Sequence, residues 1–163
     1  MLPSDKVSIW GRDQTKAQAV VDTLAERSVV AEVAEDLDEA VARAEVISGV
    51  TGSTEPLVKG ELLAVGTHVD LVGSFSADMR ESDDAVMHRG SVWVDTRADA
   101  VLAGDLAQPL ASGVLEVDDI EGDLAEVVAG TCARRTNADE ITVFKSVGTA
   151  LEDVAAAKLV FDR

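Results

Sequence analysis

The amino-acid sequence predicts an α/β fold with a doubly wound, mostly parallel sheet. Over residues 6–95, β-branched runs of about five residues alternate with helical segments of about ten or more, and adjacent positions within the runs are apolar. Aromatic residues make up only 3% of the chain, so the core must be built mainly from Val, Ala and Leu. This composition suits a sheet covered by helices better than an aromatic-rich β-sandwich.

The predicted elements of the first half follow from local patterns. Residues 6–10 form a β-rich run that Gly11 closes, and residues 14–27 carry apolar side chains at helical spacing: Ala17, Val20, Val21 and Leu24. A second strand is expected at 29–33. The next helix begins near Asp36, because acidic residues in a first turn interact favourably with the helix dipole. A third strand at 46–50 runs into a loop of small, turn-forming residues, 51–56.

The second half repeats the alternation and then changes. Further strands are predicted at 67–72 and 91–95, helices at 97–112 and 118–129, and a final strand, polar loop and helix over 141–161. Gly104, Gly113 and Gly130 punctuate the helical part. Ligands of such sheets bind outside the carboxyl ends of the strands. The corresponding segments are Gly11–Arg12, 50–52, 72–74 and Asp95–Thr96.

Charge and cysteine content exclude several classes of function. The 31 Asp and Glu against 14 Lys and Arg give a net charge of −17, which repels phosphate backbones and anionic lipids, so we expect no nucleic-acid or membrane partner. Cys132 is the single cysteine, which predicts a reducing cytoplasm. We expect no metal site, because His68 and His88 have no spacing typical of a ligand set. Neither a secretory signal nor a membrane-spanning apolar run is recognisable.

A dinucleotide site is suggested by the fold class, although the G-x-G-x-x-G motif is not present. The run 7–11 followed by Arg12 looks like the second strand of a Rossmann unit, where the residues at the strand end contact the adenosine ribose. An acidic side chain there favours NAD, whereas an arginine accommodates the 2′-phosphate of NADP. Arg12 therefore favours NADP. Asp13 weakens this inference, and Arg12 as a solvated surface charge stays an alternative.

Three long segments, at 72–83, 91–114 and 140–162, resemble the ornithine cyclodeaminase and mu-crystallin family in order and spacing. The resemblance implies an incomplete Rossmann domain over 1–140, and a strand, loop and helix over 141–163 that return toward a substrate-binding and dimerisation domain. That domain and the glycine-rich first turn are built from N-terminal sequence that the family would place before Met1. The chain is thus expected to be a truncated form of a protein that is a homodimer when full-length.

The resemblance also implies a set of residues that bind NAD(P). They are Gly11, Arg12 and Asp13 at the adenosine, Thr51 and Gly52 along the cofactor, Leu71, Val72 and Gly73 beneath the nicotinamide, and Ser146 and Val147 against it. Ordinary turn geometry is the alternative for Gly52, Gly73 and Gly148. The resemblance assigns no catalytic residue.

One departure separates the activities within the family. Where ornithine cyclodeaminases carry a catalytic aspartate, this chain has Phe75, which can neither accept a proton nor pair with an ammonium group. The pattern around it resembles reductases of cyclic ketimines such as Δ1-pyrroline-2-carboxylate, which use NAD(P)H. Ornithine cyclodeamination to proline and ammonia, and a non-catalytic truncated product, stay as alternatives. Two interpretations stay open for the Arg80–Glu81 pair: it fixes the turn into the next helix, or it is a charge pair at the surface. Two stay open for Lys145 as well: its side chain meets a substrate carboxylate, or it is solvated.

Overall fold

The computed structural model describes residues 6–162, which form two compact units divided between Arg43 and Ala44. Residues 1–5 and 163, at the ends of the two predicted domains, lie outside the described residues. The predicted domain boundary at residue 140 stays a prediction.

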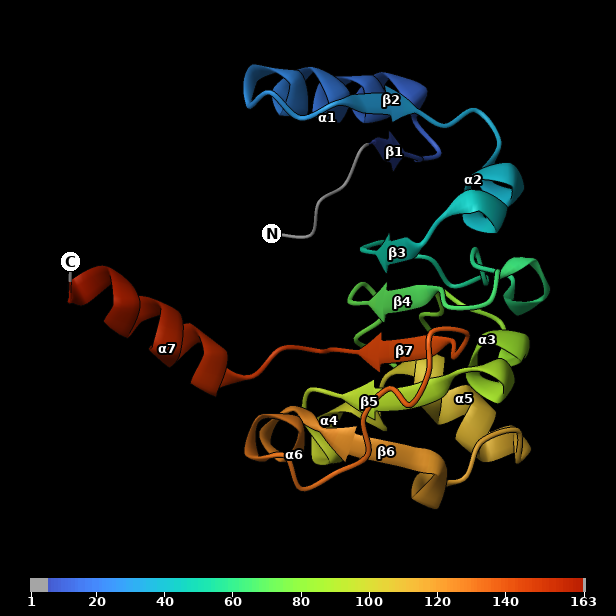
Figure 1. Cartoon of the computed structure of the whole chain (residues 1–163), viewed down its shortest axis with the longest axis vertical. Helices are drawn as coiled ribbons and strands as arrows, with labels where there is room; N and C mark the ends of the chain where they lie inside the picture. The colour runs from blue at the N-terminus through green and yellow to red at the C-terminus, as the bar shows by residue number, and fades with distance from the viewer. Residues whose placement is uncertain (1–5, 163) are drawn as a thin grey trace. The chain divides into compact units, whose positions relative to one another are not determined.

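The first unit contains a two-stranded parallel sheet and two helices (Figure 1). Its elements are β1 (Val7–Ile9), α1 (Gln14–Glu26), β2 (Ala31–Val33) and α2 (Leu37–Arg43). All four were predicted within one or two residues. α1 begins where it does because the Asp13 carboxylate accepts hydrogen bonds from the backbone N–H groups of Thr15 and Lys16, at 3.0 and 3.2 Å.

The second unit is built around a five-stranded parallel sheet with the order β3-β4-β7-β5-β6 (Figure 1). The strands are β3 (Val46–Gly49), β4 (His68–Leu71), β5 (Ser91–Val94), β6 (Ile120–Asp123) and β7 (Thr142–Lys145). The α/β class with parallel strands is thereby confirmed. The last strand of the chain lies in the middle of the sheet, between β4 and β5.

Helices connect and follow these strands. They are η1 (Gly60–Leu62), α3 (Asp84–Arg89), α4 (Arg97–Ala100), α5 (Gly104–Ser112), η2 (Val117–Asp119), α6 (Leu124–Ala129) and α7 (Ala150–Phe161). α5 ends at Gly113, which adopts the left-handed conformation with φ +75°, where a glycine is favoured.

The predicted helix at 118–129 was wrong in its first half. Residues 120–123 form β6 on β5, with Ile120 and Gly122 buried and Glu121 exposed, and α6 begins only after Asp123. The Asp123 carboxylate accepts a hydrogen bond from Glu126 N–H at 2.9 Å, which starts the helix there. Pairing with β5 thus overrides the local helical pattern. The predicted helix at 97–112 is likewise divided into α4 and α5.

The core of the second unit lies mainly on one face of the central strands, because Val69 and Val92 pair with Val143, and Leu71 and Val94 follow two positions later on the same face. Its fully buried apolar side chains include Val69, Leu71, Val92, Val94, Val143, Val86 and Leu106. α7 leaves the carboxyl end of β7 and extends away from the sheet, and every one of its residues is exposed (Figure 1). Within residues 6–162, no helix is long and apolar enough to cross a membrane.

Candidate nicotinamide site at the strand ends

The position of β7 brings the carboxyl ends of three strands together. Leu71 of β4 and Val94 of β5 each pair with Lys145 of β7. Just beyond these pairs, Ser146 N–H donates to the Leu71 carbonyl at 3.0 Å and Asp95 N–H donates to the Lys145 carbonyl at 3.2 Å. The predicted loop at 146–148 therefore lies between the ends of β4 and β5, at the edge where parallel sheets bind ligands.

The loop after β7 is held by one buried carboxylate. Asp95, 4% exposed, accepts hydrogen bonds at Oδ2 from the Ser146 hydroxyl at 3.1 Å and from the backbone N–H groups of Val147 and Gly148, both at 2.7 Å. Its Oδ1 accepts from Thr96 N–H at 2.7 Å. Hydrogen bonds to an ionised acceptor are the stronger kind. The backbone of this loop is thus fixed before any ligand arrives.

Lys145 is fully buried beneath the same edge. Its Nζ donates to the carbonyls of Leu71 at 2.9 Å and Ser146 at 2.7 Å. Burial lowers the pKa of the Lys145 ammonium, and the negative charges of Asp105, Glu81 and Asp95 oppose that shift. Neither sequence-based interpretation of Lys145 fits, because the amine is neither solvated nor placed at the surface to meet a substrate.

Glu81 connects the ends of β3 and β4. Its carboxylate, 1% exposed, accepts hydrogen bonds at Oε1 from Thr51 N–H at 2.5 Å and from the Thr51 hydroxyl at 2.8 Å. Its Oε2 accepts from Gly73 N–H at 2.7 Å. The interpretation of Arg80–Glu81 as a surface pair is therefore wrong. The two predicted cofactor residues Thr51 and Gly73 share one acceptor group.

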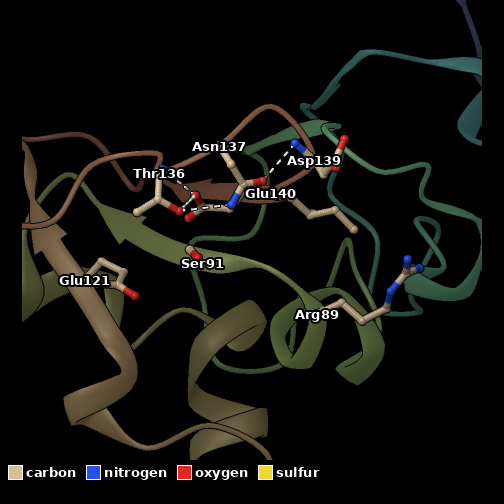
Figure 2. A pocket seen from close by; sticks show the side chains of 8 residues that line it. Arg89, Ser91, Glu121, Thr136, Asn137, Asp139 and Glu140 are labelled. Carbon is tan, nitrogen blue, oxygen red and sulfur yellow. Dashed lines mark hydrogen bonds between the residues drawn. The ribbon is translucent and has the colours of Figure 1, made fainter.

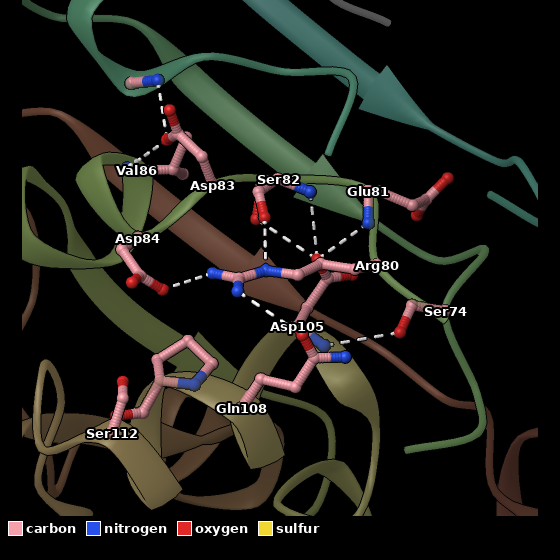
Figure 3. Close-up of polar contacts among 12 residues, drawn as sticks. Ser74, Arg80, Glu81, Ser82, Asp83, Asp84, Val86, Asp105, Gln108 and Ser112 are labelled. Carbon is pink, nitrogen blue, oxygen red and sulfur yellow. Dashed lines mark hydrogen bonds and ion pairs between the residues drawn. The ribbon is translucent and has the colours of Figure 1, made fainter. Parts of the chain in front are cut away.

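A second buried carboxylate, Asp105, supports this arrangement (Figure 3). Its Oδ1 accepts from Glu81 N–H at 2.9 Å, Ser82 N–H at 3.0 Å and the Ser82 hydroxyl at 3.1 Å. Burial raises the pKa of Asp105. Arg80 adds to the network by donating to the Ser82 carbonyl at 2.8 Å and pairing with Asp84. Asp105 was missed from the sequence because the helix predicted over 97–112 made it look like any acidic residue of a helix.

The solvent side of this edge is apolar. Val50, Val72 and Phe75, which follow β3 and β4, are exposed by 72, 41 and 67%. A Cβ added to Gly52 would meet no atom within 4 Å, so the space beside this loop is open. Leu71, by contrast, has a side chain that is fully buried, and its carbonyl already accepts from Lys145. Among the predicted residues of this edge, Val72 therefore offers an accessible apolar surface and Leu71 does not.

The structure thus brings part of the predicted site together. Within the second unit, the residues that gather at one edge of the sheet are Thr51, Gly52, Leu71, Val72, Gly73, Ser146 and Val147. Gly11, Arg12 and Asp13 belong to the first unit, where they join β1 to α1. Arg12 is exposed there.

A separate pocket of about 610 Å³ lies at the opposite edge, by the amino ends of β5, β6 and β7 (Figure 2). Its polar side chains bind one another: Glu140 accepts from Thr136 N–H at 2.6 Å and from the Thr136 hydroxyl at 2.8 Å. The hydrogen bond from Thr136 N–H has the largest effect on the pKa of Glu140, which is lowered to about 2. The carboxylate is therefore a fixed part of this loop, and the pocket is remote from the strand-end site.

Neither histidine belongs to a cluster of three or more potential metal ligands within residues 6–162. His68 lies in β4, where its Nδ1 is 2.8 Å from the Thr142 hydroxyl, and burial lowers its pKa. His88 lies in the last turn of α3 and is exposed. Over residues 6–162, no group of three or more His, Cys, Asp or Glu side chains is placed to hold a metal ion.

Comparison with known proteins assigns the family. The family model described as "Ornithine cyclodeaminase/mu-crystallin family" matches residues 1–163. The chain belongs to this family. Its resemblance to the family over 72–83, 91–114 and 140–162, noted from the sequence, is thereby confirmed.

Individual proteins resemble the chain over nearly its whole length. It is 43% identical over 161 residues to Protein SAR DEFICIENT 4 of Arabidopsis thaliana, covering 96% of this chain and 50% of that protein. It is 38% identical over 162 residues to a Δ1-pyrroline-2-carboxylate reductase of Paracoccus denitrificans, with 98% and 51% covered.

A solved structure has the same fold over nearly the whole chain. The Thermococcus litoralis Δ1-pyrroline-2-carboxylate reductase in complex with NADH and L-proline aligns with a TM-score of 0.92 at 31% identity, covering 96% of this chain and 49% of that one. The Rossmann-like class predicted from the sequence is confirmed. The chain spans about half the length of the relatives it matches.

Proposed function

We propose that this chain forms the cofactor-binding part of an NAD(P)H-dependent reductase of cyclic ketimines such as Δ1-pyrroline-2-carboxylate. The observation that carries the proposal is the loop 146–148, which Asp95 fixes beside the end of β4. The printed activity of the Paracoccus denitrificans relative and the NADH bound to the Thermococcus litoralis relative support it. This proposal includes the substrate class and the homodimer implied by the family resemblance. It also includes the cytoplasmic setting expected from the single cysteine.

The residues present fit a nicotinamide ring. Its flat, apolar face matches the exposed side chain of Val72, and the open space beside Gly52 leaves room for the rest of the cofactor. When bound, a reduced nicotinamide supplies hydride to the substrate. The chain's own residues would supply position: Val72 would lie against the face of the ring, and Ser146 and Val147 would contact it from the loop after β7. The Val147 and Gly148 N–H groups bind Asp95, so they orient the loop rather than the ligand.

The adenosine end is assigned to Gly11, Arg12 and Asp13, with NADP favoured over NAD. The Asp13 carboxylate also caps α1, so its presence next to Arg12 has a structural reason and does not by itself favour NAD. The exposed Arg12 guanidinium suits the 2′-phosphate.

Replacing Arg12 with alanine is expected to weaken NADPH binding about 10-fold, the effect of losing one hydrogen bond to a charged group, and to leave NADH binding unchanged. Dissociation constants from nucleotide fluorescence measure both effects. Arg27→Ala, which removes another exposed arginine of the same unit, is the control and should change neither constant. Equal loss for both nucleotides in Arg12→Ala would contradict the assignment.

The substrate class is tested by comparing two reactions in the reconstituted enzyme, in which this chain is joined to the N-terminal sequence that the family resemblance implies. We expect reduction of Δ1-pyrroline-2-carboxylate by NADPH, and no ammonia release from L-ornithine, because exposed Phe75 replaces the carboxylate that handles protons in cyclodeaminases. Vigorous ammonia release would overturn the reductase assignment. If the purified chain binds no cofactor at millimolar concentration, it is not catalytically competent alone.

A further inference from the structure

The Glu81 carboxylate has all the features of a group that positions two loops. It lies between β4 and α3, is almost completely buried, and uses both of its oxygens to accept hydrogen bonds from Thr51 and Gly73. Because it is buried and its oxygens are engaged, it is not placed to contact a ligand at the surface. Any influence it has on a ligand must therefore pass through the residues that it binds.

The two bound residues stand at equivalent places on neighbouring strands. Gly49 of β3 pairs with Leu71 of β4, and both strands end at this pair. A Cβ on Gly73 would lie 2.0 Å from the Thr51 carbonyl oxygen and 2.5 Å from Glu81 Oε1, so the two loops and the carboxylate are in close contact. The spacing between the loops is thus fixed by Glu81.

Asp105, from the first turn of α5, fixes Glu81 in turn (Figure 3). Its Oδ1 receives the backbone N–H of Glu81 and both donors of Ser82, whereas its buried Oδ2 has no hydrogen-bond partner within residues 6–162. The position of the Glu81 main chain therefore depends on one oxygen of Asp105.

We propose that Glu81 is a positioning residue for the nicotinamide cofactor: it holds the loops that begin at Thr51 and Gly73 at the separation that receives the cofactor, and Asp105 holds Glu81 in place. This inference rests on the proposed function. It adds to that function two buried carboxylates that bind backbone donors of the site without touching the cofactor themselves.

Glu81→Gln is the sharpest test. A glutamine has nearly the shape of glutamate, but one carboxylate oxygen becomes an NH₂ group, so whichever way the amide is turned, a backbone N–H of Thr51 or Gly73 faces another donor. We expect faster hydrogen exchange of at least one of these two amides in the cofactor-free protein and an NADPH dissociation constant about 10- to 100-fold higher. Glu121→Gln, an exposed glutamate of β6, is the matched control and should change neither value.

Asp105 provides a second pair of variants should Glu81→Gln fold poorly. Asp105→Asn can keep the Oδ1 acceptor and place its NH₂ where Oδ2 lacks a partner, so near-normal NADPH binding is expected. Asp105→Ala removes the acceptor and should weaken binding in the same direction as Glu81→Gln. Recovery by asparagine but not by alanine supports positioning by this oxygen.

Two outcomes overturn the inference: unchanged exchange of Thr51 and Gly73 in Glu81→Gln, or faster exchange with unchanged NADPH affinity. Failure of the proposed function is recognised separately, because it is seen as absent cofactor binding in the wild-type protein. In that case the exchange of the two amides still reports whether Glu81 holds the loops.

Discussion

Replacing Gly73 with alanine is expected to lower the free energy of unfolding by about 3 kcal/mol, the upper range for inserting a group into a closely packed site. The added Cβ would lie 2.0 and 2.3 Å from the Thr51 carbonyl oxygen and amide nitrogen, and these are backbone atoms that cannot rotate away. Moving them would also break the hydrogen bonds to Glu81. Urea unfolding followed by circular dichroism measures the loss.

Gly52→Ala is the matched control for this prediction, because the same added methyl group meets no atom within 4 Å in the neighbouring loop. We expect its stability to stay within about 0.5 kcal/mol of wild type, as for ordinary surface substitutions. Equal stability of Gly73→Ala and Gly52→Ala would contradict the close approach of the loops at 51 and 73.

Much of this edge was predictable because local patterns mark where strands end. β-branched runs followed by Gly, Ser and Thr placed the ends of β3, β4 and β5 within one or two residues. In contrast, β6 was not recognised, since Ile120–Asp123 has too few apolar residues to stand out from the helical pattern around it, and becomes a strand only by pairing with β5. The strand order, with β7 between β4 and β5, also depends on contacts between distant parts of the chain.

The buried polar network was the part that the sequence did not indicate. Asp105 binds the N–H of Glu81, 24 residues away, and no local spacing relates the two. Lys145 is different, since a signal was available: the sequence predicts a parallel sheet buried on both faces, so the side chain of a lysine in its last strand had to be buried or to reach past the strand end. A buried lysine then requires nearby acceptors and counter-charges, which are the Leu71 carbonyl and the carboxylates around it.

Lys145→Met is expected to lower the free energy of unfolding by about 3 to 5 kcal/mol near pH 7, the usual effect of removing one partner from a buried set of charges. Methionine fills a similar volume but leaves two carbonyls without their donor and removes the positive charge that faces Asp105, Glu81 and Asp95. Chemical unfolding at a series of pH values measures the effect. Lys158→Met, on exposed α7, is the control and should be nearly neutral.

The pH dependence identifies the cause of this loss. Burial already raises the pKa of Asp105 above its ordinary value of 3.8, and Lys145 opposes that shift, so the variant should raise it further. A carboxyl that binds its proton more tightly in the native than in the unfolded state stabilises the native state as the pH falls through its native pKa. The deficit of Lys145→Met should therefore be full above that pKa and shrink as the pH falls toward 3.8. A deficit that is constant between pH 8 and 4 would attribute the loss to packing and hydrogen bonding alone.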